Sequence, residues 1–161
     1  MAPATGKITG NDLGESMTDV TGLQPLVVRP GEGEQLPFVG TLRASAADTG
    51  GTFEVIEFTG TATPPPHVHK EHDEVFFILT GTFRFVLGHD TVEAPQGTIV
   101  VVPRGWRHGF TVEPGATALF MVLPAGLGGF FKDLGTGLAE GLSSAEIRAS
   151  LAGKYDSYPE P

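Results

Sequence analysis

Cysteine is absent from this chain of 161 residues. Its absence excludes a disulfide framework, a thiol nucleophile and a metal site built from thiolates. Basic residues are also scarce, with 10 Lys and Arg against 19 Asp and Glu and a formal net charge of -9. This balance disfavours nucleic-acid phosphates and anionic lipid surfaces as partners. We therefore expect neither nucleic acid nor a membrane among the partners.

Long apolar segments are missing as well. Residues 1–20 contain no apolar core of the kind that a signal peptide needs, and no segment is long and apolar enough to span a bilayer. The expected location is the cytoplasm. The length suits one domain, since a domain of about 150 residues buries close to 70% of the surface of its unfolded chain.

Glycine, proline and phenylalanine are abundant, with 23, 13 and 11 residues. This composition favours an all-β fold of short strands joined by tight turns. Predicted strands are stretches rich in β-branched and aromatic residues between turn residues. They are 23–28, 38–45, 52–59, 74–79, 83–87, 91–93, 98–102, 108–112 and 117–123.

The chain divides into three predicted segments. Residues 1–20 lack periodicity and are expected to form a flexible arm, and residues 21–124 carry the strands of a β-barrel. Residues 125–161 are expected to form short helices and a polar tail. Within them, Ser143 and Glu146 have the spacing of a capping box at the start of a helix.

Two histidines, His67 and His69, are separated by a single residue and follow three consecutive prolines. In an extended strand both side chains project to the same face. The prolines hold the backbone extended ahead of them. Imidazoles joined by a carboxylate suit a divalent transition metal such as Fe, Mn, Ni, Cu or Zn.

Three residues in the following short loop could supply the next ligand: Glu71, His72 and Glu74. Strand phase favours Glu74, because an inward-facing Glu74 places Phe76 and Ile78 on the same face. His72 is then a surface residue or a neighbour of the ligands. A further donor, His108, stands in the later stretch GTIVVVPRGWRH.

These two stretches together resemble the two motifs of the cupin family. The residues at the family spacing are His67, His69, Glu74 and Gly81 in the first motif, and Gly97, Pro103, Gly105 and His108 in the second. Thr61 and Val112 stand at supporting positions where the motifs have Gly and Asn. The resemblance covers roughly residues 38–124. It implies a single jelly-roll β-barrel in which His67, His69, Glu74 and His108 hold one metal ion.

Side-chain alternation suggests an apolar pocket beside the metal. Its candidate lining residues are Phe76, Ile78, Val100, Val102, Phe110 and Met121. For each of them, an ordinary place in the barrel core is the favoured alternative. Trp106 and Arg107 precede His108 near the expected mouth, where Trp106 could stack on an aromatic substrate and Arg107 could meet a carboxylate or phenolate.

Within the family, the chain is most similar to small bacterial cupins that look like quercetin 2,3-dioxygenase. The similarity lies in DEVFFILTG, in PRGWRHGF and in an Ala-Gly…Phe-Phe segment after the last strand. It implies a metal-dependent dioxygenase that uses O2 on an enolic or phenolic, flavonol-like small molecule. Glu74 would be both a metal ligand and the general base that deprotonates the substrate hydroxyl.

Two other functions fit the same residues. A metal acting only as a Lewis acid could serve an isomerase, cyclase or lyase of a natural-product intermediate. A cupin could also bind a metal or a small apolar ligand without catalysis. In each case the family resemblance implies a homodimer.

Overall fold

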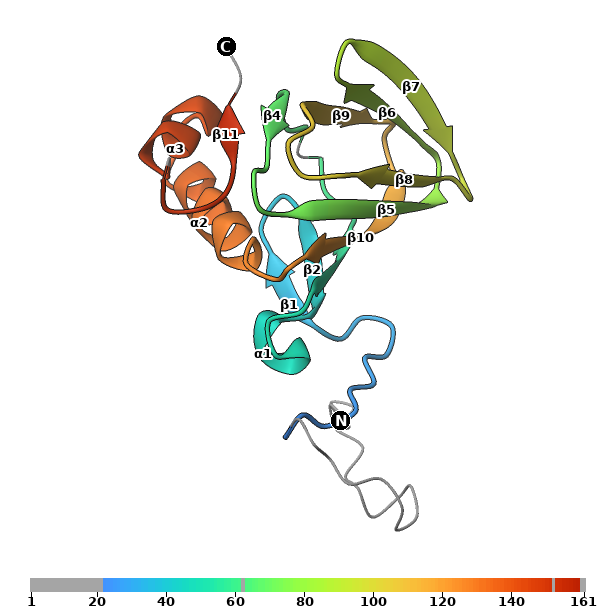
Figure 1. The fold of residues 1–161 in the computed structure, drawn as a ribbon, viewed down its shortest axis with the longest axis vertical. Helices are drawn as coiled ribbons and strands as arrows, with labels where there is room; N and C mark the ends of the chain where they lie inside the picture. Colours follow the sequence, from blue (N-terminus) through green and yellow to red (C-terminus); the bar gives the residue numbers. More distant parts are fainter. Residues whose placement is uncertain (1–21, 62, 152, 160–161) are drawn as a thin grey trace.

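The protein, of which the computed structural model describes residues 22–61, 63–151 and 153–159, folds into two antiparallel sheets that form a barrel (Figure 1). One sheet has the strand order β1-β2-β3-β10-β5-β8. Its strands are β1 (Glu34–Leu36), β2 (Gly40–Ala44), β3 (Glu54–Phe58), β5 (Asp73–Thr80), β8 (Ile99–Val102) and β10 (Thr117–Leu123). The other sheet has the order β11-β4-β9-β6-β7. Its strands are β4 (His67–Val68), β6 (Thr82–Leu87), β7 (Asp90–Pro95), β9 (His108–Val112) and β11 (Tyr158–Pro159). The predicted all-β jelly roll is confirmed.

Three helices accompany the barrel: α1 (Ala46–Thr49), α2 (Gly128–Ala139) and α3 (Ser144–Ser150). Figure 1 shows α2 and α3 together along one side of the barrel, next to β4 and β11. Ser143 caps α3, since its hydroxyl accepts from the Glu146 N–H while the Glu146 carboxylate accepts from the Ser143 N–H. Within the described ranges, no helix is long and apolar enough to cross a lipid bilayer.

The start of the sheet differs from the prediction. Residues 23–28 form no strand beyond an isolated bridge at Leu26, because Leu26 and Val27 stay exposed and no neighbouring strand extends the pairing. The first strand is β1, which lies between the predicted strands 23–28 and 38–45 and pairs with β2. The predicted arm at residues 1–20 lies outside the described residues.

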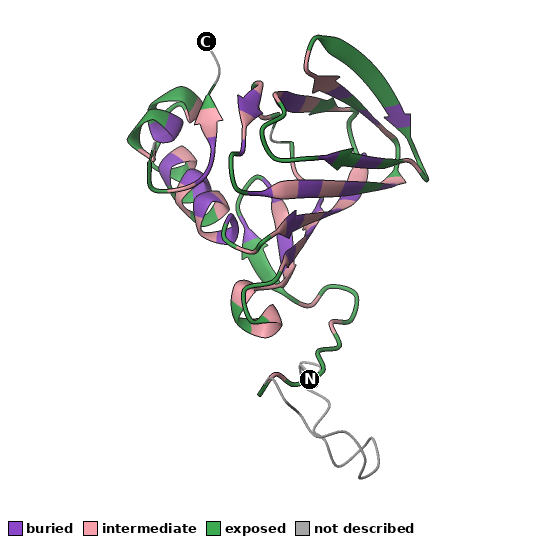
Figure 2. Cartoon of the chain, in the orientation of Figure 1, coloured by how far each residue is buried: buried purple, intermediate pink, exposed green. Residues whose placement is uncertain are grey.

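The core lies between the two sheets and combines aliphatic side chains with a group of phenylalanine rings. The alternation of β5 buries Glu74, Phe76 and Ile78 and leaves Phe77 exposed, as Figure 2 illustrates for the sheet as a whole. The Phe76 ring stacks on Phe120 and meets Phe110 edge to face. These rings fill the centre of the barrel, so the polar side chain of Glu74 sits at the end of an otherwise apolar face.

A buried carboxylate fixes α2 against the barrel. Glu54 of β3 accepts hydrogen bonds through Oε2 from the N–H groups of Gly126, Leu127 and Gly128, at 2.9–3.0 Å. A Cβ at Gly128 would lie 2.8 Å from Glu54 Oε1, so glycine is needed for this close approach. A small apolar cluster of Phe130, Leu134 and Ile147 then joins α2 to α3. Both helices are thereby held over one end of the barrel.

Candidate metal centre and its cavity

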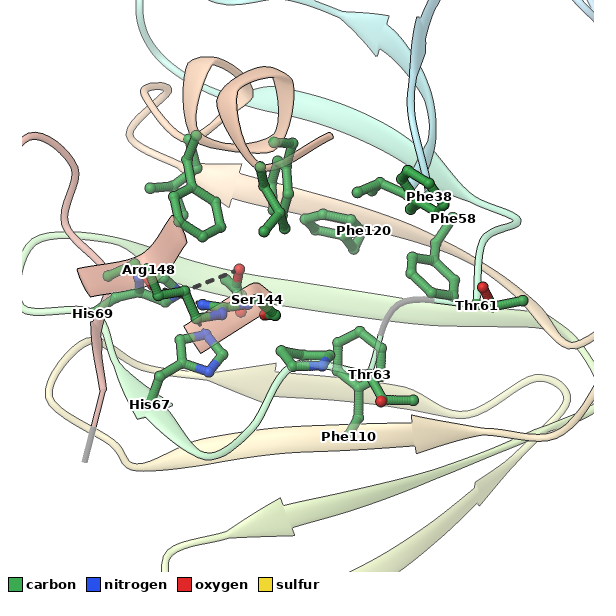
Figure 3. A pocket seen from close by; sticks show the side chains of 18 of the residues that line it. Phe38, Phe58, Thr61, Thr63, His67, His69, Phe110, Phe120, Ser144 and Arg148 are labelled. Atoms are coloured by element: carbon green, nitrogen blue, oxygen red, sulfur yellow. Dashed lines mark hydrogen bonds and ion pairs between the residues drawn. The ribbon is translucent and has the colours of Figure 1, made fainter. Parts of the chain in front are cut away.

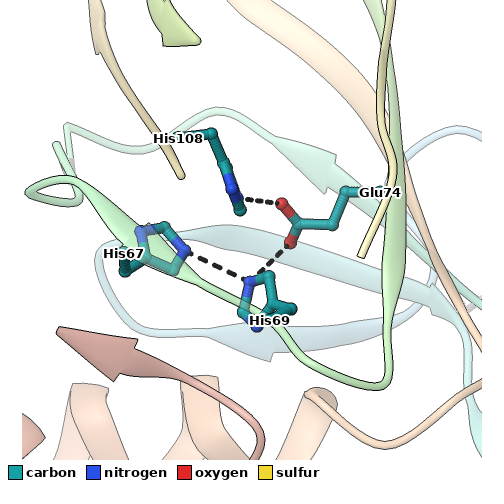
Figure 4. A group of neighbouring side chains, drawn as sticks. All are labelled: His67, His69, Glu74 and His108. Atoms are coloured by element: carbon teal, nitrogen blue, oxygen red, sulfur yellow. Dashed lines mark hydrogen bonds and ion pairs between the residues drawn. The ribbon is translucent and has the colours of Figure 1, made fainter. Parts of the chain in front are cut away.

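Four buried side chains converge at that end of the barrel, three of them from the strands β4, β5 and β9 and one, His69, from the loop directly after β4. The ligand atoms of His67, His69, Glu74 and His108 all lie within 4.8 Å of one another. Their closest contacts are His67 Nε2 to His69 Nε2 at 3.2 Å and His108 Nε2 to Glu74 Oε2 at 2.9 Å. Figure 4 shows the three imidazole rings turned toward the Glu74 carboxylate. The register of the sheets explains the convergence, since His67 on β4 pairs with His108 on β9.

In each of the three imidazoles, the Nδ1 atom is held by a backbone carbonyl oxygen, and this contact fixes the direction in which Nε2 points. Nδ1 of His67, His69 and His108 contacts the backbone carbonyl oxygens of Pro65, Asp156 and Trp106. A carbonyl oxygen only accepts, so each neutral ring carries its proton on Nδ1 and keeps a free lone pair on Nε2.

In these neutral tautomers the Nε2 lone pairs of His67 and His69 would face each other at 3.2 Å without a hydrogen between them. A cation bound by all three Nε2 atoms and the carboxylate resolves this opposition. Neutral imidazoles with their second nitrogen tied to a carbonyl are the usual form of histidine ligands. The residues therefore fit a divalent transition metal.

The local charges favour the binding forms of His67 and Glu74. For His69, burial would lower the pKa, but the Glu74 carboxylate outweighs it and raises the pKa. Burial and the neighbouring His108 lower the pKa of His67 to about 3. Burial alone would raise the pKa of Glu74, but the His108 and His69 rings outweigh it and hold the pKa below its usual range. Glu74 is therefore an ionised carboxylate at neutral pH and His67 a neutral imidazole, as metal ligation requires.

The other two candidate ligands in the loop, Glu71 and His72, lie outside the cluster. His72 is buried, but its Nδ1 lies 2.7 Å from Asp156 Oδ2, and its ring takes no part in the cluster. Glu71 is exposed. The Asp156 carboxylate also accepts from the N–H groups of Lys70, Glu71 and His72, while the Asp156 carbonyl holds His69. The tail thus supports the ligand loop, a role that no local sequence signal indicated.

A cavity of about 240 Å³ opens beside the cluster. His67, His69 and Glu74 form part of its wall. The remaining wall includes seven phenylalanines from both sheets, from α2 and from the turn between β1 and β2, namely Phe38, Phe58, Phe76, Phe110, Phe120, Phe130 and Phe131. Figure 3 shows this arrangement, with Arg148 and Ser144 of α3 at the end where His67 and His69 lie. The cluster of His67, His69, Glu74 and His108 thus faces a mainly apolar cavity covered by the C-terminal helices.

The residues expected to line the pocket fall into three groups. Phe76 and Phe110 do line the cavity. Ile78, Val100 and Val102 are buried in the barrel core away from it. Met121 lies on the opposite face of β10 from the lining residue Phe120.

The turn before His108 also contributes nothing to the cavity wall. The Trp106 side chain is 55% exposed, and Arg107 donates to the Gly88 carbonyl oxygen. The wall instead includes residues that the alternation pattern missed, among them Phe58, Phe130 and Arg148. Those on α2 and α3 are brought there by tertiary packing.

Comparison with known proteins agrees with this geometry. Residues 54–123 match the sequence model of the cupin domain. This barrel is a cupin domain. The cupin domain spans β3 to β10 and contains all four members of the metal cluster. Quercetin 2,3-dioxygenase of Bacillus subtilis is 30% identical over 100 residues, which make up 59% of this chain but only 30% of that protein.

Solved structures show the same fold at low identity. A protein from Planctomyces limnophilus superimposes with a TM-score of 0.54 at 23% identity, covering 63% of this chain and 90% of its own. Pac13, a nucleoside dehydratase, gives a TM-score of 0.52 at 15% identity, covering 63% and 84%. At such identities these likenesses establish the cupin fold alone.

Proposed function

We propose that this protein is a metal-dependent dioxygenase that acts on an enolic or phenolic small molecule. The observation that carries the proposal is the set of three Nε2 lone pairs and one ionised carboxylate converging on the wall of an aromatic cavity. The similarity to quercetin 2,3-dioxygenase over 100 residues supports the oxidative reaction. A flavonol-like compound is the substrate class that this similarity suggests.

In this proposal His67, His69, His108 and Glu74 hold the metal. When bound, the metal supplies a Lewis acid for the substrate oxygen and, if it is redox-active, a centre for reaction with O2. The phenylalanine rings of the cavity hold a flat substrate against the cluster and exclude water. The backbone carbonyls on the three Nδ1 atoms keep the imidazoles oriented throughout.

Glu74 is also the proposed acceptor of the substrate hydroxyl proton. Its pKa is held low by His69 and His108, which makes the resting carboxylate a weak base. Proton transfer therefore requires a substrate hydroxyl that is itself acidified, as an enol or phenol is beside a Lewis acid. This requirement favours enolic and phenolic substrates over simple alcohols.

The first test is the metal content of protein purified without chelator, measured by mass spectrometry. Wild type should carry close to one Fe, Mn, Ni or Cu per chain, and Glu74→Ala and His108→Ala should lose most of it. Glu71→Ala and His89→Ala are matched controls, since both residues are exposed and outside the cluster. Wild type that stays metal-free after reconstitution would refute the proposal.

Oxygen uptake on flavonols and other enols is the second test. Uptake that depends on Glu74 and on the metal would establish the oxidative reaction. Because three imidazoles and a carboxylate also suit zinc, a zinc-loaded protein without oxygen uptake would favour the non-redox isomerase, cyclase or lyase instead. A metal-loaded protein without turnover on either panel would indicate a binding module.

A further inference from the structure

We propose that Arg148 binds an anionic group of the substrate, so that the preferred substrate is a compact aromatic or enolic carboxylate and not a neutral phenol. The inference rests on the proposed function for the reacting hydroxyl, and it adds a second recognised group. Arg148 lies in the last turn of α3 and lines the cavity that holds the metal cluster.

The Arg148 side chain is buried without a counter-charge. The residue is only 8% exposed, and among the described residues no carboxylate pairs with it. Its Nη1 makes one long hydrogen bond of 3.4 Å to Ser157 Oγ, and its Nε has no partner. The guanidinium carbon also lies 5.1 Å from the centre of the Phe130 ring. The buried Nε donor is thus left without an acceptor.

The stability of the fold does not explain why an unpaired guanidinium is buried here. An uncompensated buried charge destabilises a protein, and an apolar residue of similar size would pack there at less cost. The last turn of α3 favours a positive charge through the helix dipole, but an exposed lysine would serve this purpose equally well. A planar fork of donors kept inside a cavity is suited to a carboxylate, which it can bind through two parallel hydrogen bonds.

Neighbouring contacts place Arg148 at the metal end of the cavity. Its partner Ser157 follows Asp156, whose carbonyl oxygen holds His69. Ser157 also precedes β11, which pairs with the histidine strand β4. A ligand that reaches the metal cluster is therefore close to Arg148, and among the described residues that line the cavity no other Arg or Lys is present.

The charges at the site and the volume of the cavity restrict the possible ligands further. A divalent ion together with Arg148 would exceed the single negative charge of Glu74, so a ligand with two ionised groups balances the buried charge. The volume of about 240 Å³ lies below the range of about 300–1,000 Å³ usual for drug-sized ligands. The aromatic wall selects a flat body. A single ring that bears a hydroxyl and a carboxylate meets all three conditions.

The test compares matched ligands by calorimetric titration of metal-loaded protein near neutral pH. The probes are 2-, 3- and 4-hydroxybenzoate, each beside its uncharged hydroxybenzamide, so that ring and hydroxyl stay constant while the charge changes. For at least one isomer, wild type should prefer the carboxylate by about tenfold or more, the effect of a charge-assisted hydrogen bond. Arg148→Gln and Arg148→Met should abolish the preference. Arg84→Gln, which alters an exposed arginine paired with Glu93, should retain it.

Several outcomes would overturn the inference. They are equal binding of all carboxylates and amides by wild type, or a preference that survives in the Arg148 variants. A lower unfolding temperature in both variants with an unchanged preference would assign Arg148 to the fold alone. Should neither variant fold, the preference is measured on chelator-treated wild type, where its loss would count against Arg148 and its persistence would support it.

The experiments distinguish a failure of the dioxygenase proposal from a failure of the Arg148 proposal. A carboxylate preference that depends on Arg148, without oxygen uptake from any substrate, would uphold Arg148 and refute the dioxygenase. Oxygen uptake that is equal from hydroxybenzoates and from neutral phenols, and that Arg148→Gln leaves unchanged, would do the reverse.

Discussion

Asp156 connects the C-terminal segment to the ligand loop through a single carboxylate. Its two oxygens accept from the N–H groups of Lys70, Glu71 and His72 and contact the His72 ring. These groups lie between the ligands His69 and Glu74. The loop between the two candidate ligands is therefore shaped by a residue that lies more than 80 positions later in the chain.

Replacing Asp156 by asparagine should weaken both the fold and the metal site. The amide retains one acceptor oxygen and loses the negative charge, so several loop N–H groups lose good partners. We expect a loss of about 1–3 kcal/mol in the free energy of unfolding and a loss of about tenfold or more in metal affinity. Urea unfolding and metal titration measure the two effects. Asp133→Asn is the control, since Asp133 pairs with Lys154 on the surface, and equal behaviour of both variants would contradict the expectation.

Low pH should destabilise the folded protein in part by protonating Asp156. Burial would raise the pKa of Asp156, but hydrogen bonds from His72, Lys70 and Glu71 outweigh it and lower the pKa below its ordinary value of 3.8. The folded state then binds this proton less readily than the unfolded state. The stabilisation is fully present above the ordinary pKa and is lost as the pH falls through the folded one.

Unfolding free energies of metal-free protein, measured from about pH 5 down to about pH 2, should therefore fall more steeply for wild type than for Asp156→Asn. Parallel curves would show that the carboxylate contributes no pH dependence.

At this scale the sequence predicted what depends on local spacing and missed what depends on distant contacts. His67 and His69 could be chosen because alternation places both on one face, and Glu74 because it then shares a face with Phe76 and Ile78. The structure gathers all three with His108. No periodicity in α3 distinguishes Arg148 as a cavity residue, because its position follows from the docking of α3 on α2.

Among the elements, β10 shows why strand phase cannot always be read from the residues. Its sequence TALFMVL is apolar at both alternating sets, so hydrophobicity does not choose a face. Pairing with β3 and β5 makes the choice, and it turns Phe120 inward and Met121 outward. In β5, residues 75–79 are also all apolar, but an inward-facing Glu74 sets the phase, and the predicted phase was right.

Helix α2 depends on Glu54 for its position over the cavity. Glu54→Gln removes the charge that three N–H groups share, and we expect a loss of about 1–3 kcal/mol in the free energy of unfolding. Amide hydrogen exchange should accelerate in α2 more than in the barrel strands. Glu57→Gln, on the same strand but paired with Arg43 at the half-exposed face, should change neither measurement much. Unchanged exchange in α2 would show that the apolar cluster alone holds the helix.

On the scale of the whole molecule, the outer face of the larger sheet is unusually apolar. Ile99, Val101 and Phe77 are 63%, 59% and 40% exposed, and register places Val75 beside Val101 and Phe77 beside Ile99. These residues lie on β8 and β5 at one end of the six-stranded sheet. Contiguous exposed apolar surface of this kind is typical of interaction sites.

The homodimer implied by family resemblance stays a prediction, and this face is the surface on which we expect the second copy. Light scattering at micromolar concentration should give the mass of two chains for wild type and of one chain for Val101→Glu. Val92→Glu on the smaller sheet is the control, since Val92 is also an exposed valine. A wild-type mass of one chain would refute the dimer, and an unaffected Val101→Glu would place its interface elsewhere.

The contact between His69 and the Asp156 carbonyl oxygen joins residues 87 positions apart in the chain. A nascent polypeptide that has emerged only as far as the second histidine stretch holds all four donors but lacks the group that orients one of them. Metal uptake during synthesis would therefore give a poorly ordered site, and high affinity arises only after the segment around Asp156 has left the ribosome. Premature termination before that segment would yield a barrel with every ligand present and a weakened hold on the ion.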